Sequence, residues 1–310
     1  CALPICWQIG VTDKEAVAWL NTRIDRACVD VNEFGPQVLV ATSYGADRVS
    51  GRPFGGVLRQ FTLDGQLRRA FSFDERHAFG EGAFAPPWAI VAAQADTANG
   101  RTRVAVVAHH FNWWPSLVTV LNERWDRVGT FVNSGWVESV QWLPQGRLAV
   151  AGFHQTDDSG MVALIDGDRP DGTSPEAPGP FACADCPAGE PLVYVTMPRS
   201  ELNILTSSEF NRATVEWTGQ RLTVRTSEVE RPGRVGSLID AVYEFSPDLE
   251  LLHATYGDRY WDKHRALEAQ GLVTHNRAAC PQRDGPPAIR VWTAATGWRT
   301  VQTGTFAPGQ

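Results

Sequence analysis

Alternating apolar and polar residues dominate the chain, and helical spacing is found in only two segments. In TDKEAVAWLNTRIDRAC (12–28), Thr12 and Glu15 form a capping box, and apolar residues follow at helical spacing. In DRYWDKHRALEAQG (258–271), a similar pattern ends at Gly271, a residue typical of helix ends. Almost everything between these segments has the pattern of short strands separated by turns. The sequence therefore predicts an all-β protein with one N-terminal and one C-terminal helix.

Three predicted hairpins share one pattern. The segment VLRQFTLDGQLRRAFSF (57–73) has Asp64-Gly65 as its turn and apolar residues on both arms. The segment VYEFSPDLELLHATY (242–256) repeats its spacing, and SLVTVLNERWDRVGTF (116–131) is a looser copy with a longer turn. The corresponding positions in the first two segments are Phe61 and Phe245, Asp64 and Asp248, and Leu67 and Leu251.

A second repeated element is an apolar strand, a loop and the next strand. Its copies are VLVATSYG…GGVLRQFTL, VAVVAHHFNWWPSLVTVL, LAVAGFHQTDDSGMVALID and LNILTSSEFNRATVEW. Repeats at intervals of about 43 to 67 residues, with about four strands each, are typical of propeller blades. We therefore expect an N-terminal anchor and helix in residues 1–35 and a β-propeller in residues 36–310. We expect five to seven blades, with six as the preferred number.

The C-terminal segment IRVWTAATGWRTV (289–301) resembles the end of a WD-repeat blade, with Trp292 and a Thr296-Gly297 turn. Thr293 stands where a WD repeat has aspartate, and the segment also partly matches the tryptophan-docking repeat of quinone-dependent propellers. The repeats as a whole are similar to WD-repeat-like or integrin-repeat-like propellers. The stretches HHFNWWPSLVTVL, GWVESVQWL and CADCPAGEP resemble a group of exported bacterial propeller-like lipoproteins. This resemblance implies a fold and a location outside the cytoplasm, but it implies no biochemical activity.

Composition is that of a folded protein: 43% of the 310 residues are hydrophobic and 20% are charged. The net charge of −7 is spread along the chain and no block of Lys or Arg occurs, which argues against nucleic acid as a partner. The longest apolar runs have the length of strands, well short of the ~18 residues that a transmembrane helix needs.

The sequence begins at Cys1, followed by Ala2, which resembles the mature start of a bacterial lipoprotein. In such proteins the thiol of the first cysteine carries a diacylglycerol, and the acyl chains hold the protein on a membrane. We therefore expect a periplasmic or other extracytoplasmic protein that is anchored to the membrane through Cys1. The alternative is that a start at cysteine is fortuitous.

Cysteine usage favours an oxidising compartment over a metal site. Besides Cys1, the candidates for disulfides are Cys6, Cys28, Cys183, Cys186 and Cys280. The first two flank the N-terminal helix, and Cys280 is either a partner or a remaining thiol. The CxxC of Cys183 and Cys186 follows a Pro- and Gly-rich loop, which favours a structural disulfide within or onto this loop over redox chemistry. A zinc site would be expected to use a second CxxC motif, which the sequence lacks.

Catalytic motifs are scarce in this sequence. No GxSxG, HExxH, Walker, GxGxxG or CxxCH pattern occurs in a suitable context, so we expect no cofactor. Asp166, Asp168 and Asp171 imitate a calcium loop, but Pro170 breaks the alternate-residue spacing. We interpret them as solvated loop carboxylates.

The most specific local cluster is HHFNWWPS (109–116). His109 and His110 follow a strand, and His154 holds a similar place in the next repeat, so these imidazoles are the candidates for a metal site. Adjacent residues on a strand point to opposite sides, however, which favours hydrogen-bonded or exposed histidines.

Three large aromatic residues lie in the same loop: Phe111, Trp113 and Trp114. Aromatic side chains outside a strand bury their rings against something, either a neighbouring blade or a partner protein. We take them as the candidate partner-binding residues.

Three classes of function fit these features. The preferred one is a non-enzymatic scaffold, anchored by lipid and docked on an integral membrane protein complex of respiratory, photosynthetic, secretory or envelope-assembly type. A propeller enzyme of hydrolase, lyase or quinone-dependent type is the first alternative, and a ligand-binding sensory lipoprotein is the second.

Overall fold

The computed structural model describes fourteen stretches of the chain. They are residues 37–41, 45–46, 53–54, 57–62, 67–79, 82–84, 88–96, 103–110, 115–154, 159–175, 183–197, 211–228, 241–256 and 288–303. Both predicted helices lie outside these residues, as do Cys1, Cys6, Cys28 and Cys280.

The described residues form an all-β structure, as predicted, with a single 3₁₀ turn, η1 (Pro144–Gly146). The first sheet has the order β1 (Gln37–Ala41), β4 (Val57–Thr62) and β5 (Leu67–Ser72). The second has the order β15 (Gly172–Thr173), β11 (Arg127–Asn133), β10 (Ser116–Leu121), β9 (Val104–His110) and β8 (Trp88–Ala95). The third has the order β12 (Val137–Trp142), β13 (Arg147–His154), β14 (Ser159–Asp166), β16 (Val193–Met197), β21 (Ala288–Thr293) and β22 (Gly297–Thr303).

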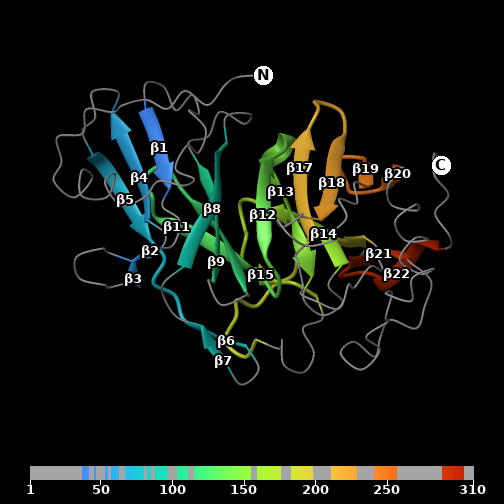
Figure 1. The fold of residues 1–310 in the computed structure, drawn as a ribbon, viewed down its shortest axis with the longest axis horizontal. Helices are drawn as coiled ribbons and strands as arrows, with labels where there is room; N and C mark the ends of the chain where they lie inside the picture. Colours follow the sequence, from blue (N-terminus) through green and yellow to red (C-terminus); the bar gives the residue numbers. More distant parts are fainter. Residues whose placement is uncertain are drawn as a thin grey trace, which may run out of the picture.

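The fourth sheet has the order β17 (Asn211–Trp217), β18 (Leu222–Glu228), β19 (Ala241–Phe245) and β20 (Leu251–Tyr256). Two short pairs complete the set: β2 (Gly45–Ala46) with β3 (Pro53–Phe54), and β6 (His77–Phe79) with β7 (Gly82–Phe84). In Figure 1 the first and second sheets lie on the left and the third and fourth on the right, where β17–β20 are seen above β14, β21 and β22. No sheet of the described residues closes on itself.

The core lies in three layers between these sheets, which explains the continuous apolar runs in the sequence. Along β9, Val104 and Val106 pack towards the first sheet, while Ala105 and Val107 pack towards the third. Along β13, alternate residues likewise face the second and the fourth sheets. Strands that are buried on both faces need apolar residues at every position, so strict alternation is lost in the middle of the molecule.

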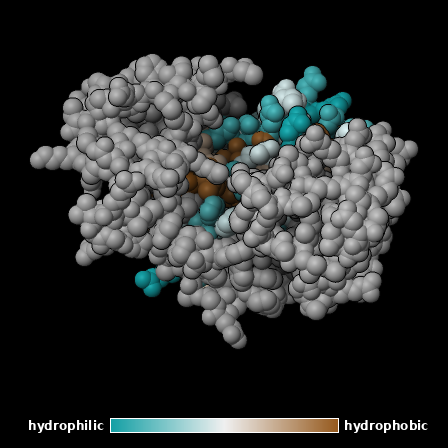
Figure 2. All heavy atoms as spheres, in the orientation of Figure 1, coloured by the Kyte–Doolittle hydropathy of each residue, from teal (hydrophilic) through white to brown (hydrophobic). Residues whose placement is uncertain are grey.

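The first strand of each sheet lies closest to the neighbouring sheets. Strand β12 contacts β8 and β9 of the second sheet and β17 of the fourth, and β1 contacts β8. From these strands, each sheet continues outward through antiparallel neighbours, except that β15 pairs in parallel with β11 at the end of the second sheet, and β21 and β22 complete the third from later in the chain. Figure 2 shows apolar residues at the surface near the middle of the molecule, between β8 and β12, and hydrophilic residues over the ends of β17 and β18.

The three predicted hairpins are confirmed, and they share one irregularity. Strands β4–β5, β10–β11 and β19–β20 are antiparallel pairs, and each pair shifts its register at the last paired residue of its first strand. Phe61 pairs with Leu67 and Phe245 with Leu251, which are the positions that correspond in sequence. Such a shift is a β-bulge, which increases the local twist of a hairpin.

The turns of the second and third hairpins have one design. In each turn, the fourth residue after the register shift has left-handed backbone angles: Trp125 (φ 68°) follows Leu121, and Leu249 (φ 58°) follows Phe245. A side chain at the start of the turn accepts two backbone hydrogen bonds: Asn122 Oδ1 from Arg124 N and Asp126 N, and Ser246 Oγ from Asp248 N and Glu250 N. These side chains offset the unfavourable φ, because they satisfy backbone donors that the turn would otherwise leave exposed.

The strand-loop-strand repeats are confirmed where the structure describes them: β1 pairs with β4, β9 with β10 and β13 with β14, all antiparallel. Residues 202–210 of the fourth copy lie outside the described residues. Strands β21 and β22 also form an antiparallel hairpin, and Gly297 of the expected Thr296-Gly297 turn lies in the left-handed region (φ 60°). The hairpin joins the third sheet through Tyr194 and Trp292, so the last strands return to the middle of the chain.

Candidate functional site

The structure confirms a disulfide in the CxxC segment. Cys183 and Cys186 are bonded, with their Cα atoms 5.6 Å apart. Both side chains pack against the apolar layer between the first and second sheets. This bond is the one sequence-predicted disulfide that falls within the described residues.

Strand β6 holds the CxxC segment in place through its backbone. Ala184 N donates a hydrogen bond to Ala78 O (3.2 Å), and Ala78 N donates one to Asp185 Oδ1 (2.8 Å). These contacts join two segments that are 107 residues apart in the sequence. They bring His77, the first residue of β6, next to the disulfide.

His77, Cys183, Asp185 and Cys186 form what we call the His77 cluster. Their potential ligand atoms all lie within 4.8 Å of one another, and no other group of three or more such residues occurs in the described part of the chain. The His77 side chain is 10% exposed, and its Nδ1 lies 3.8 Å from Asp185 Oδ1. Neither ring nitrogen of His77 has a hydrogen-bond partner among the described residues.

Burial sets the protonation of this region. It lowers the pKa of His77, assisted by the positive charge of Arg127 and opposed by Asp185. Burial also raises the pKa of Glu75, although the ion pair with Arg127 works in the other direction. His77 is therefore neutral at neutral pH, the form in which an imidazole binds a metal or accepts a proton.

Sequence reasoning missed His77 and Asp185. A lone histidine in the segment FDERHAF carries no local signal, because its neighbours in space come from residues 183–186. A signal for Asp185 was available, since a carboxylate between the two cysteines of a CxxC adds a third donor of metal-ligand type.

The three histidines proposed from the sequence are found in separate aromatic environments. His109 stacks on Trp136 with ring centroids 4.5 Å apart, and His110 lies edge-on to Trp88 at 5.3 Å. His154 packs between Tyr194 and Trp298. The three are not among the described groups of potential metal ligands. The neighbouring His109 and His110 contact different aromatic residues, as expected for adjacent positions on a strand.

Phe111, Trp113 and Trp114 lie outside the described residues, but both ends of their loop are described. His110 N donates a hydrogen bond to Pro115 O (2.9 Å), and His109 pairs with Ser116. Ser116 is fully buried, and its Oγ accepts a hydrogen bond from Val137 N (2.8 Å). The loop therefore starts and ends on a fixed and buried base.

The three loop aspartates have separate structural partners. Asp166 Oδ1 accepts a hydrogen bond from Asp168 N (2.9 Å), and Asp171 Oδ1 accepts one from Thr130 N (2.7 Å). Asp168 pairs with Arg103. Each carboxylate therefore has a structural role of its own: Asp166 stabilises the turn, Asp171 binds the backbone of β11, and Asp168 pairs with Arg103.

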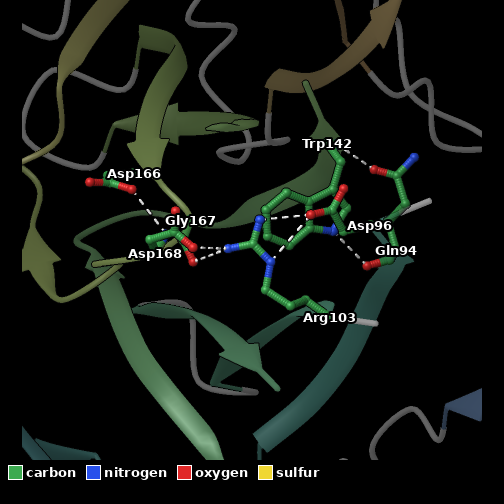
Figure 3. A network of polar contacts seen from close by, with 7 residues as sticks. All are labelled: Gln94, Asp96, Arg103, Trp142, Asp166, Gly167 and Asp168. Atoms are coloured by element: carbon green, nitrogen blue, oxygen red, sulfur yellow. Dashed lines mark hydrogen bonds and ion pairs between the residues drawn. The ribbon is translucent and has the colours of Figure 1, made fainter. Parts of the chain in front are cut away.

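Arg103 is the centre of a second buried polar group, the Arg103 cluster, made of Asp96, Arg103, Trp142, Gly167 and Asp168 (Figure 3). Arg103 donates to Asp96 Oδ2 (2.7 Å), Asp168 Oδ1 (2.7 Å) and Gly167 O (2.9 Å). Its guanidinium carbon lies 4.6 Å from the Trp142 ring centroid, and the indole N–H donates to Gln94 O (2.9 Å). The cluster joins the second and third sheets, because Arg103 binds Asp96 after β8 as well as Gly167 and Asp168 after β14.

We compared the chain with protein-family models and with curated proteins. No protein-family model matches the chain, and no curated protein matches it. Within the part of the chain that the structure describes, no helix has the length and apolar character needed to cross a membrane.

Proposed function

We propose that this protein is a non-enzymatic interaction subunit of an extracytoplasmic, membrane-associated complex. In this role the loop of Phe111, Trp113 and Trp114 contacts an integral membrane protein. The observation that carries the proposal is the fixed base of this loop at His110 and Pro115. A rigid base lowers the entropy cost of ordering a binding loop, so more of the contact energy remains as affinity.

The proposed compartment rests on the disulfide. Disulfides persist in secreted and periplasmic proteins and are rare in the reducing cytosol. The bond between Cys183 and Cys186 therefore supports an oxidising location. Membrane attachment through Cys1 stays a prediction, which mass spectrometry of the native N-terminal peptide tests by its diacylglyceryl mass.

The proposed architecture is a β-propeller of five to seven blades, with six as the preferred number. It is supported by four successive meanders whose first strands β1, β8, β12 and β17 lie nearest to the neighbouring sheets. Blades of a propeller have this arrangement, with the first strand at the central axis. A propeller presents the loops of several blades on one face, which suits a scaffold.

The decisive experiment compares the wild type with the double variant Trp113→Ala/Trp114→Ala in native membranes. Aromatic anchors at interfaces contribute ~2 kcal/mol or more each, so the double variant is expected to lose its co-purifying partner. Its thermal unfolding midpoint is expected to stay that of the wild type. Leu252→Ala, which truncates an exposed apolar side chain on β20, is the matched control and keeps the partner.

Two results overturn the proposal. A clearly lower unfolding midpoint of the double variant places the two indoles in the core. An unchanged set of co-purifying proteins shows that the loop makes no contact with them.

A further inference from the structure

We propose that His77, Cys183, Asp185 and Cys186 bind one zinc-type divalent cation when the cysteine pair is reduced. In the oxidised protein the same two sulfurs form the disulfide, so the site exchanges a covalent bond for a metal ion. This inference goes beyond the proposed interaction role, and its test in vitro is independent of that role.

The set of donors fits zinc. Two thiolates, one imidazole and one carboxylate make the four ligands that a tetrahedral zinc site requires. Ligand distances of ~2.0 to 2.3 Å place neighbouring donors about 3.3 to 3.8 Å apart. The four donor atoms here already lie within 4.8 Å of one another, so small side-chain rotations are enough to close the site. Thiolate ligands favour zinc over calcium and magnesium, which take oxygen ligands.

His77 has the features of a metal ligand. Its ring is buried, and neither nitrogen has a hydrogen-bond partner among the described residues. A buried polar group without a partner lowers the stability of the fold, and metal coordination removes this cost.

Asp185 is oriented by the backbone. Its Oδ1 accepts the hydrogen bond from Ala78 N, and the same oxygen lies 3.8 Å from His77 Nδ1 and 3.5 Å from Cys183 Sγ. Outer contacts of this kind orient metal ligands and strengthen binding. The hydrogen bond from Ala184 N to Ala78 O holds the CxxC segment against β6, so all four ligands come from two segments that are already joined.

The change from disulfide to zinc site needs a reductant, and a dithiol supplies the electrons and protons. The reductant gives two electrons and two protons to the Cys183–Cys186 bond and itself becomes a disulfide. One zinc ion then replaces the two thiol protons, which pass to solvent, and two zinc–sulfur bonds form. The reverse reaction needs a disulfide oxidant and releases the ion.

The first experiment uses the full chain in two states. One sample is oxidised, the other is reduced with dithiothreitol, and both are freed of metal and desalted without oxygen. Titration with Zn²⁺ against a chromophoric chelator is expected to give one bound equivalent that depends on reduction. Titration with Co²⁺ is expected to give the intense visible bands of tetrahedral cobalt and a thiolate-to-cobalt charge-transfer band.

Variants assign the ligands. His77→Ala and Asp185→Asn are each expected to weaken zinc binding by at least about 10-fold, and Cys183→Ser reduces the charge-transfer band because one of the two thiolates is gone. His253→Ala replaces an exposed histidine on β20 and is expected to bind zinc as the wild type does. The Asp185 side chain is half exposed, so Asp185→Asn keeps the test decisive where His77→Ala fails to fold.

Three results overturn the proposal. The oxidised chain binds zinc as tightly as the reduced chain, or the reduced chain binds none. Alternatively, zinc affinity and the cobalt spectrum are unchanged in both His77→Ala and Asp185→Asn, which assigns the metal to cysteines alone.

Discussion

The Arg103 cluster and the His77 cluster bury similar polar groups but use them differently. The guanidinium of Arg103 is 8% exposed and makes ion pairs or hydrogen bonds with three groups, two carboxylates and a carbonyl. The imidazole of His77 is as deeply buried, yet neither of its nitrogens has a hydrogen-bond partner in the described structure. A fully satisfied polar group rigidifies a core, whereas an unsatisfied one keeps its capacity to bind.

Their positions match this difference. The Arg103 cluster lies between the two central sheets and involves residues at the ends of β8, β9, β12 and β14 (Figure 3). The His77 cluster lies at the edge of the first apolar layer, on a three-residue strand and a segment without regular structure. The first holds sheets together, and the second can change its bonding without disturbing them.

The largest expected effect comes from Arg103→Met. It leaves Asp96, whose side chain is fully buried, without its cation, and breaking a buried pair in this way costs about 3–5 kcal/mol. Urea unfolding of the oxidised protein measures this loss. Arg124→Met removes an exposed pair with Asp126 and is the control, with an expected loss below ~1 kcal/mol. Equal losses in the two variants contradict the structural role of Arg103.

A smaller effect is expected from the double variant Cys183→Ala/Cys186→Ala. The disulfide spans a sequence separation of three, so its removal restores little chain entropy and costs about 2 kcal/mol. Urea unfolding under the same conditions measures this loss in the free energy of unfolding, for comparison with the loss in Arg103→Met. A loss as large as that of Arg103→Met contradicts the view that the covalent bond matters less to stability than the Arg103 cluster.

Within the Arg103 cluster, Asp168→Asn is expected to cost about 1 kcal/mol or less. The Asp168 side chain is half exposed, so water screens its pair with Arg103 and replaces part of it. Thermal unfolding measures the change. A loss close to that of Arg103→Met shows that the exposed arm of the cluster carries its stability.

The smallest effect on stability is expected from His77→Leu in the oxidised protein. Leucine fills a similar volume and removes two buried nitrogens without partners, so the free energy of unfolding is unchanged or rises by up to about 1 kcal/mol. Zinc binding by the reduced chain is expected to weaken at the same time, by at least about 10-fold as in His77→Ala. A large loss of stability shows that the imidazole is a structural group, and the His77 cluster then resembles the Arg103 cluster.

Local patterns were enough to predict much of the fold. The spacing of Phe61, Asp64 and Leu67 recurs around Phe245, and the structure gives both hairpins the same register shift. Asp64-Gly65 indicated a tight turn, because glycine readily adopts left-handed backbone angles. Leu249, which corresponds in sequence to Gly65, has such angles in the other hairpin. These features depend on a few neighbouring residues, so the sequence contains them.

The candidate site depends on distant pairs, which one sequence does not reveal. Arg103 meets Asp168 across 65 residues, and β6 meets the CxxC segment across 107. From the sequence, a zinc site was expected to use a second CxxC, whereas the structure places His77, from another part of the chain, beside the only CxxC. For the adjacent histidines, in contrast, strand geometry alone was enough. It predicts that neighbouring side chains point to opposite sides, and His109 and His110 do contact different rings.

The central claim is that the His77 cluster changes its bonding while the Arg103 cluster keeps the sheets intact. Hydrogen exchange of the oxidised, the reduced and the zinc-loaded chain, followed by mass spectrometry, tests it most directly. We predict that the amides of β9, β13 and β14 keep the same protection in all three states. Changes are expected only around residues 75–79 and 183–187. Loss of protection in the central strands on reduction would contradict the claim.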